Sequence, residues 1–290
     1  MNVRGKPDLA LTADEELPHK ASRLLKHLRR RGASIPVSTA PWDKERLHRA
    51  AIRGSHKLAK EDVAFVCGEM LDFCEQGFWT VLPLQVALLL PHIRLSPLGV
   101  VPQRNRRSRI IVDYTFLGVN DETVRLVPSK AMQFGKALQR LLAKLVYANP
   151  SYGPVWLGKI VIADGFDRIM LQASDIPRLG VILPTSSGEP LVALPLSLPM
   201  GWVESPPYFT AATETACDLL NSELRRTTSL PPHPLKSLAA TPPPEVTNSL
   251  PRQARCLAAP GSAAMRSPPL AAYGDVYVDD FILVAQTQRH

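Results

Sequence analysis

The feature that most constrains this chain is a pair of adjacent aspartates, Asp279 and Asp280, inside an apolar run. Tyr277-Val278 precedes the pair and Phe281-Ile282-Leu283-Val284 follows it. Neighbouring residues on a strand point to opposite faces, so two charged neighbours in such a run predict the turn of a β-hairpin. Ionised carboxylates side by side repel each other and are costly to remove from water without a partner. A divalent cation would offset both the repulsion and the cost of removing the carboxylates from water. The simpler alternative is an Asp-Asp turn without a ligand.

Composition limits the class of protein and of partner. The 290 residues are 45% hydrophobic, which is enough for two packed units or one large lobed domain. Lys and Arg outnumber Asp and Glu by 34 to 26, which gives a formal net charge of +8 and favours polyanions as partners. No apolar run approaches the ~20 residues that span a bilayer, so no membrane partner is predicted.

The first residues and the cysteines bear on the compartment. Residues 1–6 lack the apolar core of a signal peptide. The cysteines are widely spaced without a metal-type pairing, so we expect free or buried thiols in a reducing compartment. An intracellular protein, cytoplasmic or nuclear, is therefore predicted. The cysteines are Cys67, Cys74, Cys217 and Cys256.

Two basic stretches are candidate contacts for nucleic acid. Residues 1–59 form a basic N-terminal extension, whose densest cluster, residues 26–31, lies on a predicted helix that ends at Gly32. The second stretch has four arginines within six residues, on a predicted loop that leads into a strand at 110–114. Guanidinium groups match phosphate oxygens bidentately, so this loop predicts a grip for phosphates. A solvated surface is the alternative for both stretches. The four arginines are Arg104, Arg106, Arg107 and Arg109.

Apolar spacing predicts the main elements elsewhere. A core-facing helix is predicted over 60–77, and strands are predicted at 78–82 and 155–162. Ser129 and Ser205 are predicted caps of two further helices. The apolar stripe of the 60–77 helix consists of Val63, Val66, Cys67, Met70 and Cys74.

Residues 225–270 differ from the rest of the chain in composition. Ten prolines lie between Pro231 and Pro269, among Ser, Thr and Ala and with few large apolar residues. Such a segment cannot bury a core, so a flexible, partly extended insertion is predicted. The segment could also recruit proline-recognising domains.

From about residue 60 to the end, four blocks in this order resemble the reverse transcriptase domain of long-terminal-repeat retrotransposons and retroviruses. Tyr277-Val278-Asp279-Asp280 is similar to the catalytic hairpin of that family. The other blocks are similar to a fingers strand, to the polar link after the first palm strand, and to the turn and helix beneath the templating base pair. They are Arg109-Ile110-Ile111-Val112-Asp113-Tyr114 with Leu117 and Asn120, Asp175-Ile176-Pro177-Arg178, and Leu198-Pro199-Met200-Gly201-Trp202 with Ser205-Pro206 and Phe209.

The resemblance implies an α+β, right-hand polymerase fold. Its fingers would occupy residues 60–150, and a truncated palm, an antiparallel sheet backed by helices, would occupy residues 151–290 and contain the Pro-rich insertion. A thumb is expected to be absent. The implied activity is RNA-directed DNA synthesis with two Mg²⁺ or Mn²⁺ ions, deoxynucleoside triphosphates and a primed RNA or DNA template. The sequence does not indicate an oligomeric state.

The resemblance also implies roles for individual residues. Asp279 would bind both metal ions and Asp280 would support the site, so both are predicted catalytic and metal-binding residues. Arg104 and Arg106 would contact nucleic acid. Arg109 would meet the triphosphate, and Phe166 would reject a ribose 2′-hydroxyl. The full set of predicted nucleotide-binding residues is Arg107, Arg109, Phe166, Met200 and Gly201.

The chain departs from the family at one position of the site. When Gly165-Phe166 is aligned with the family's Gly-aromatic pair, Val161 stands where the first metal-binding Asp belongs. Asp164, three residues on, is a candidate substitute ligand. We therefore predict an impaired polymerase and keep two alternatives open. One is an inactive remnant that at most binds nucleic acid, and the other is an interaction protein that recruits partners through the Pro-rich insertion.

Overall fold

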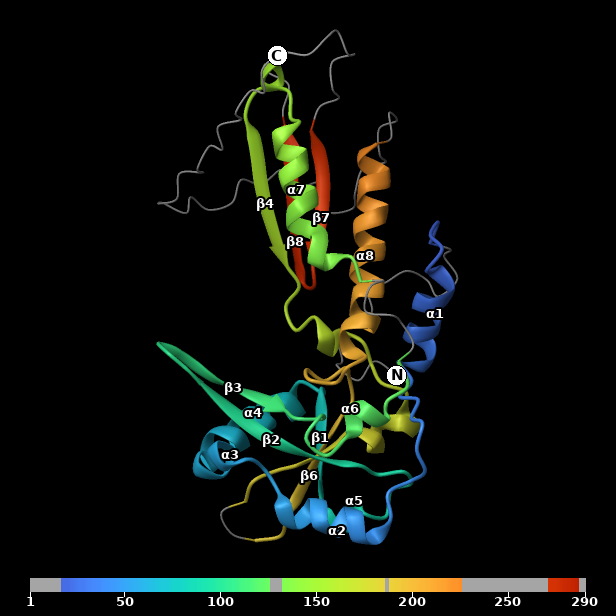
Figure 1. Cartoon of the computed structure of the whole chain (residues 1–290), viewed down its shortest axis with the longest axis vertical. Coiled ribbons are helices and arrows are strands. Elements are labelled where there is room, and N and C mark those ends of the chain that lie inside the picture. The colour runs from blue at the N-terminus through green and yellow to red at the C-terminus, as the bar shows by residue number, and fades with distance from the viewer. Residues whose placement is uncertain (1–16, 126–131, 186–187, 226–270, 287–290) are drawn as a thin grey trace. The chain divides into compact units, whose positions relative to one another are not determined.

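The computed structural model describes residues 17–125, 132–185, 188–225 and 271–286. They form two compact units, each built from two separate stretches of chain (Figure 1). The first unit contains the residues up to 132 and residues 163–212, and the second contains residues 133–162 and those from 213 on. Helices and strands occur in both units, in agreement with an α+β class. The division into fingers at 60–150 and palm at 151–290 stays a prediction.

The first unit is organised around a mixed five-stranded sheet of order β1-β6-β5-β2-β3. Only β2 and β5 run parallel, and the other neighbours in this sheet are antiparallel. Leu95, Val181 and Val192, which come from its three middle strands, are fully buried. The strands are β1 (Trp79–Pro83), β2 (Leu95–Gln103), β3 (Arg106–Val112), β5 (Gly180–Ile182) and β6 (Leu191–Pro195).

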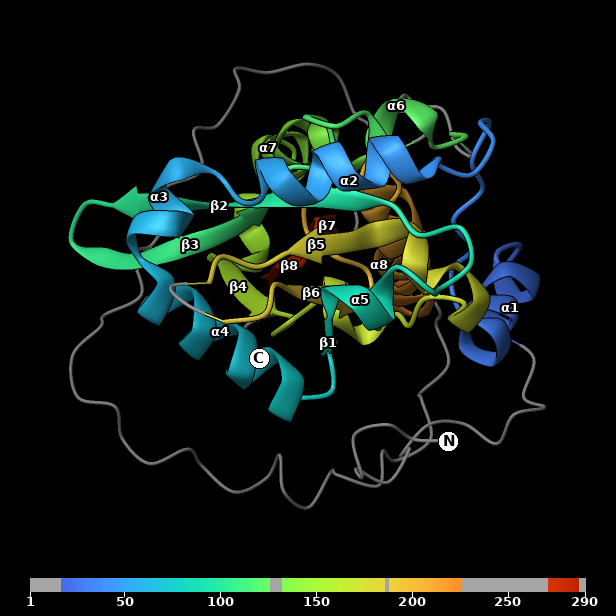
Figure 2. The same cartoon turned by 90° about the horizontal axis from the view of Figure 1, so that it is seen from below.

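Short helices surround this sheet. Helices α2 and α3 pack against β2, and α4 packs against β1 (Figure 2). Val66 and Met70, four residues apart on α4, are buried, as expected for the core-facing side of an amphipathic helix. The helices are α1 (Ser22–Arg31), α2 (Lys44–Arg53), α3 (Lys57–Glu61), α4 (Val63–Glu75), α5 (Leu84–Ala87), α6 (Val119–Glu122) and the first part of α8 (Ser205–Leu224). Two 3₁₀ segments, Phe166–Arg168 and Ala173–Leu179, complete the unit.

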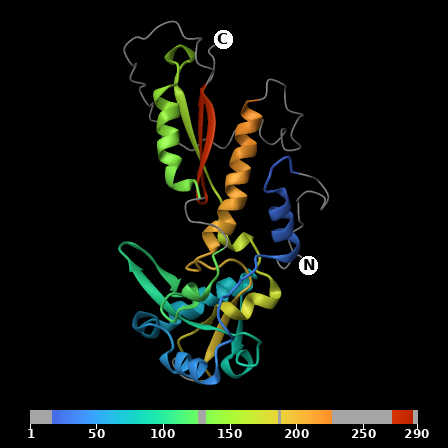
Figure 3. The same ribbon diagram turned by 45° about the vertical axis from the view of Figure 1, so that its right-hand side comes forward.

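The second unit is an antiparallel three-stranded sheet of order β4-β8-β7 with α7 along it (Figure 3). Leu141 of α7 packs with Val155 and Val284 in a small core. The elements are α7 (Ala137–Val146), β4 (Val155–Val161), β7 (Ala272–Tyr277), β8 (Asp280–Gln286) and the later part of α8, with 3₁₀ segments at Phe134–Lys136 and Pro150–Tyr152.

Helices α7 and α8 lie on opposite faces of this three-stranded sheet. Asp275 of β7 is bonded to Arg140 of α7. A Cβ added to its neighbour Gly274 would lie 2.5 Å from the Leu220 side chain of α8. Because adjacent strand residues point to opposite faces, the two helices enclose the sheet at β7.

Most predicted elements are confirmed. The helices predicted to end at Gly32 and to span 60–77 are α1 and α4, and the strands predicted at 78–82 and 155–162 are β1 and β4. The helix predicted to begin near Ser205 is α8. Ser205 is the first residue of the helix and not its cap, and its hydroxyl donates to the Pro199 carbonyl oxygen at 2.7 Å. Among the helices of the described residues, none is long and apolar enough to cross a membrane.

Two predictions are wrong. The arginine-rich stretch is not a loop leading into a strand, because β2 and β3 close through a two-residue turn at Arg104-Asn105 and the strand already begins at Arg106. The apolar stripe of α4 is core only in part, because Cys67 is exposed. Ser129 and residues 226–270, which include nearly all of the Pro-rich segment, lie outside the described residues.

Candidate functional site

The aspartate pair lies at the turn of the β7–β8 hairpin. Tyr277 and Asp280 form the last cross-strand pair, so Val278 and Asp279 make a two-residue turn. The predicted hairpin is confirmed, but its turn lies one residue earlier than the aspartate pair, because Asp280 already belongs to β8. Val278 has φ of 57°, a conformation that is strained for a β-branched residue by about 1–3 kcal/mol. Backbone strain of this kind persists only where the surroundings impose it, and it clusters at functional sites.

The strand that ends beside this turn is β4. Its last residue, Val161, is the direct cross-strand neighbour of Asp280, and the Ile162 amide donates to the Asp279 carbonyl oxygen at 3.0 Å. Directly opposed side chains in an antiparallel pair lie on the same face, so Val161 and Asp280 share one face of the sheet. The Val161 side chain is 56% exposed. The position at which the resemblance expects a carboxylate is therefore next to Asp280 and open to solvent.

Lys159 supplies a cation at the same place. Its Nζ lies 2.8 Å from Oδ2 of Asp280. Lys159 and Val161 are two residues apart on β4, so both project from the face that carries Asp280. Among the described residues, Asp279 has no ion-pair partner, so the two aspartates differ in their electrostatic environment. The sequence predictions missed Lys159, although its parity with Val161 indicated a shared face.

The residues at the turn do not fit a two-ion site. Two catalytic ions about 3.5–4 Å apart need carboxylates from both strands, and here β4 contributes Lys159 and Val161. No group of three or more His, Cys, Asp or Glu side chains that could hold a metal occurs within the described ranges. Asp164 belongs to the first unit, in a turn where its φ is 52°, whereas the hairpin belongs to the second unit. The magnesium ions stay a prediction.

In the first unit, two of the quoted blocks meet. Asn120 clamps the 198–202 turn, because its Nδ2 donates to the Gly201 carbonyl oxygen and its Oδ1 accepts from the Val203 amide, each at 3.0 Å. Gly201 has φ of 100°, and a Cβ there would lie 2.4 Å from the Val112 carbonyl oxygen, so only glycine fits. This contact holds Met200, which is 61% exposed, next to the end of β3.

The Gly165-Phe166 pair is held against α8. The Phe166 and Phe209 rings lie 5.0 Å apart between centroids, and a Cβ added to Gly165 would lie 2.6 Å from the Phe209 ring. Phe166 is half-buried by this packing. The aromatic side chain that the resemblance assigns to sugar selection is therefore fixed by aromatic packing within the first unit.

The arginines of the β2–β3 hairpin fall into two groups. Arg107 forms an ion pair with Glu69 of α4, and its guanidinium also lies 3.6 Å from Asp72. Its charge is thus already balanced by α4. Arg104, Arg106 and Arg109 are exposed, and none of the three forms an ion pair among the described residues. These three are the arginines of the stretch that remain available for phosphate.

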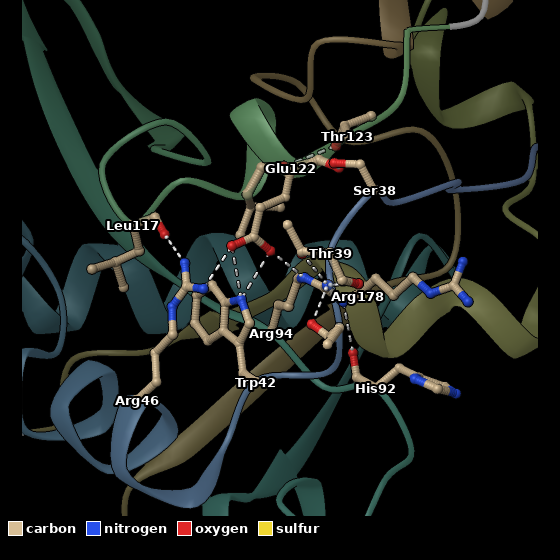
Figure 4. A network of polar contacts seen from close by, with 12 residues as sticks. Ser38, Thr39, Trp42, Arg46, His92, Arg94, Leu117, Glu122, Thr123 and Arg178 are labelled. Atoms are coloured by element: carbon tan, nitrogen blue, oxygen red, sulfur yellow. Dashed lines mark hydrogen bonds and ion pairs between the residues drawn. The ribbon is translucent and has the colours of Figure 1, made fainter.

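A buried carboxylate that the sequence predictions missed organises the first unit (Figure 4). Glu122 accepts from Trp42 Nε1 at 2.9 Å and from Arg94 Nε at 2.8 Å, and Arg46 Nη1 lies 2.6 Å from it. Burial disfavours its charged form, but the hydrogen bonds from Arg94, Trp42, Thr39 and Arg46 outweigh burial and lower the pKa of Glu122. The Arg94 side chain is fully buried. No local pattern marks this set, because its members come from separate segments.

A second buried carboxylate joins α7 to β7. Asp275 accepts from Arg140 Nε at 2.7 Å and Arg140 Nη2 at 2.6 Å, and the Tyr273 hydroxyl donates to it at 2.8 Å. Burial disfavours the charged form here as well, but the bonds from Arg140, Tyr273 and the Val276 amide lower the pKa of Asp275. Burial, together with the adjacent Asp275, raises the pKa of Tyr273 to about 12. This bidentate pair anchors the strand that leads into the hairpin turn.

The two lowered carboxyl pKa values predict acid instability. A carboxyl group with a lower pKa in the folded state stabilises the fold above its ordinary pKa, here 4.5 for Glu122 and 3.8 for Asp275. That stabilisation is lost as the pH falls through the folded pKa values. We expect the urea midpoint to fall steeply below about pH 4, and Glu122→Gln and Asp275→Asn each to flatten the fall. A midpoint that stays constant to about pH 2 would contradict this account.

Comparison with known proteins adds no relative. No family model matches the chain, and no curated protein matches it significantly.

Proposed function

We propose that this chain is a reverse-transcriptase-like domain that binds primed template but carries out template-directed nucleotidyl transfer poorly. The observation that carries the proposal is the hairpin turn with Asp279 and Asp280, whose cross-strand neighbour on β4 is Val161. The arrangement supports a polymerase-like site with two of the three expected carboxylates. The ion pair between Lys159 and Asp280 favours the impaired form, because a protein cation already neutralises Asp280.

Two further observations support a right-hand polymerase fold. The hairpin strands and β4 form an antiparallel sheet that α7 and α8 back, in line with the sheet backed by helices that the resemblance implies for a palm. The block from Arg109 to Asn120 contacts the 198–202 turn, as expected if both serve one nucleotide site. A divalent ion, if bound, would be held by Asp279 and Asp280, one carboxylate short of the two-ion set.

Binding of primed template tests the proposal without requiring catalysis. If Arg104, Arg106 and Arg109 contact phosphates, changing all three to Ala should flatten the salt dependence of binding. Each lost phosphate contact should reduce the slope of log K against log salt by about 0.9 on duplex, so a total loss of up to about 3 is expected. Filter-binding or anisotropy titrations over a range of salt concentrations measure the slope.

Lys57→Gln is the matched control for this titration. Lys57 is an exposed lysine at the start of α3 and is paired with Glu61 at 3.6 Å. The substitution removes one positive charge from the same unit without touching the hairpin. The control should leave the slope unchanged. A slope that the three hairpin substitutions also leave unchanged would remove the β2–β3 hairpin from the binding surface.

A further inference from the structure

A cleft of about 370 Å³ lies within the first unit, between α2 and the turn that follows β3. Arginines at helical spacing and two aromatic side chains line it, and no carboxylate does. The lining residues that matter here are Arg46, Arg49, Arg53, Trp42, Phe116 and Leu117. None of them belongs to the β2–β3 hairpin or to the four blocks that define the proposed polymerase site, except Leu117.

Protein contacts hold two of the guanidinium groups in place. The Arg46 guanidinium lies 3.9 Å above the Trp42 ring and donates to the Leu117 carbonyl oxygen at 2.9 Å. The Arg53 guanidinium lies 4.8 Å from the centre of the Phe116 ring and donates to the Ser55 carbonyl oxygen at 3.0 Å. A pre-ordered arginine loses less conformational freedom on binding than a mobile one. Arg46 is also paired with Glu122, so Arg53, which has no ion-pair partner among the described residues, is the one suited to an anionic ligand.

Phe116 is a large aromatic side chain left open to solvent. It is 51% exposed, yet its backbone amide donates to Asp113 Oδ1 at 3.0 Å. The His56 and Phe116 rings also form a T-shaped contact, with 5.2 Å between their centroids. A fixed and exposed aromatic ring beside cationic groups is the arrangement on which an unstacked nucleobase is bound.

Two nearby carboxylates pair with two of the three arginines of the cleft, so its net charge remains positive. Glu122 is buried behind Arg46, and Glu45 pairs with Arg49 at the exposed surface of α2. His56 separates Asp113 from Arg53: its Nδ1 lies 3.2 Å from Arg53 Nη2 and its Nε2 lies 3.1 Å from Asp113. Arginine can only donate, so Nδ1 is the acceptor in its contact with Arg53.

We infer that this cleft binds single-stranded nucleic acid, with one base stacked on Phe116 and an adjoining phosphate on Arg53. The cleft volume lies near the lower end of the ~300–1,000 Å³ of ligand pockets, which suits one unstacked nucleotide rather than a base pair. A stacked duplex offers no free base face to an aromatic side chain. The inference deepens the proposed function, on which it rests, by adding a single-strand site separate from the β2–β3 hairpin.

The test is fluorescence anisotropy of the full chain with labelled oligo(dT) and with an abasic oligonucleotide of equal length. Phe116→Leu should weaken oligo(dT) binding by about tenfold to a hundredfold, leave the salt slope unchanged and have no effect on the abasic strand. Arg53→Lys keeps the charge but loses the planar stack, so it should weaken oligo(dT) binding severalfold at constant slope. Circular dichroism checks that the variants fold; Phe116 is half-exposed, so its replacement is expected to be tolerated.

The outcomes distinguish single-stranded nucleic acid from other ligands of the cleft. Unchanged oligo(dT) binding by folded Phe116→Leu overturns the inference, and so does an equal loss on the abasic strand. Competition by free thymidine monophosphate as strong as that by the strand would identify a free nucleotide as the ligand, and equal competition by poly-glutamate would identify an acidic peptide; either overturns it. Changing Arg104, Arg106 and Arg109 to Ala tests the hairpin separately. If that change has no effect while Phe116→Leu does, the hairpin surface of the proposed function fails and the cleft stands.

Discussion

Replacing Val161 with Asp is expected to raise template-directed primer extension by about a hundredfold or more. Val161 is the cross-strand neighbour of Asp280 and is exposed, so the new carboxylate would lie on the same face as Asp280 with room for a ligand. A catalytic ion contributes several kcal/mol of transition-state stabilisation, and ~1.4 kcal/mol corresponds to tenfold in rate. The loss that we assign to Val161 is therefore at least about a thousandfold, of which the substitution should recover a large part.

The matched control is Val161→Asn, which has nearly the same shape as Asp but no charge and should give no gain. Adding Asp279→Asn to Val161→Asp should abolish the gain, and adding Lys159→Met should increase it by freeing Asp280 from its ion pair. Assays should use the chain alone and the chain fused to the thumb of a reverse transcriptase, which grips the primer. Robust extension by the unmodified chain, lost in Asp164→Asn, would show instead that Asp164 is the ligand from this part of the chain.

The hairpin with its turn at Val278-Asp279 was predictable because its signal is local. Two charges in an apolar run break the alternation of a strand, and a hairpin turn is the only place where both stay near water. The same holds for α1 and α4, because the residues that end a helix and the spacing of its apolar residues can be recognised within the segment itself. The strand over 155–162 also followed from its own composition. Val161 was identified through the resemblance, when Gly165-Phe166 is aligned with the family's Gly-aromatic pair.

What the sequence did not reveal depends on contacts between distant residues. Arg107 is a predicted nucleotide-binding residue, and in the structure it forms an ion pair with Glu69 of α4. No residue near position 107 in the sequence indicates that partner. Lys159 and Asp280 are likewise brought together only by strand pairing. The arginine stretch predicts a loop because charged residues are rare in buried strands, whereas β3 is exposed along most of its length.

The network around Glu122 is expected to give the largest stability effect in the chain. Arg94→Met removes a fully buried guanidinium and leaves Glu122 buried with Trp42 and Arg46. Removing one partner of a buried ion pair typically costs about 3–5 kcal/mol, and the loss here should lie at the lower end because Arg46 and Trp42 still contact Glu122. Urea unfolding should therefore show a much lower midpoint with an unchanged m-value.

An exposed arginine pair and a double-mutant cycle make this prediction specific. Arg49 pairs with Glu45 at the surface of α2, and Arg49→Ala should cost no more than about 0.5 kcal/mol. Glu122→Gln alone should also be strongly destabilising, because it leaves the Arg94 charge buried without its carboxylate. The two changes together should cost less than the sum of the single changes, by about 0.5–3 kcal/mol. The reason is that each change removes the buried charge that the other leaves without its partner. Additive losses would mean that Arg94 and Glu122 stabilise the unit independently, through packing and through the bonds of Arg94 to Thr39 and Ala40, and not as an ion pair.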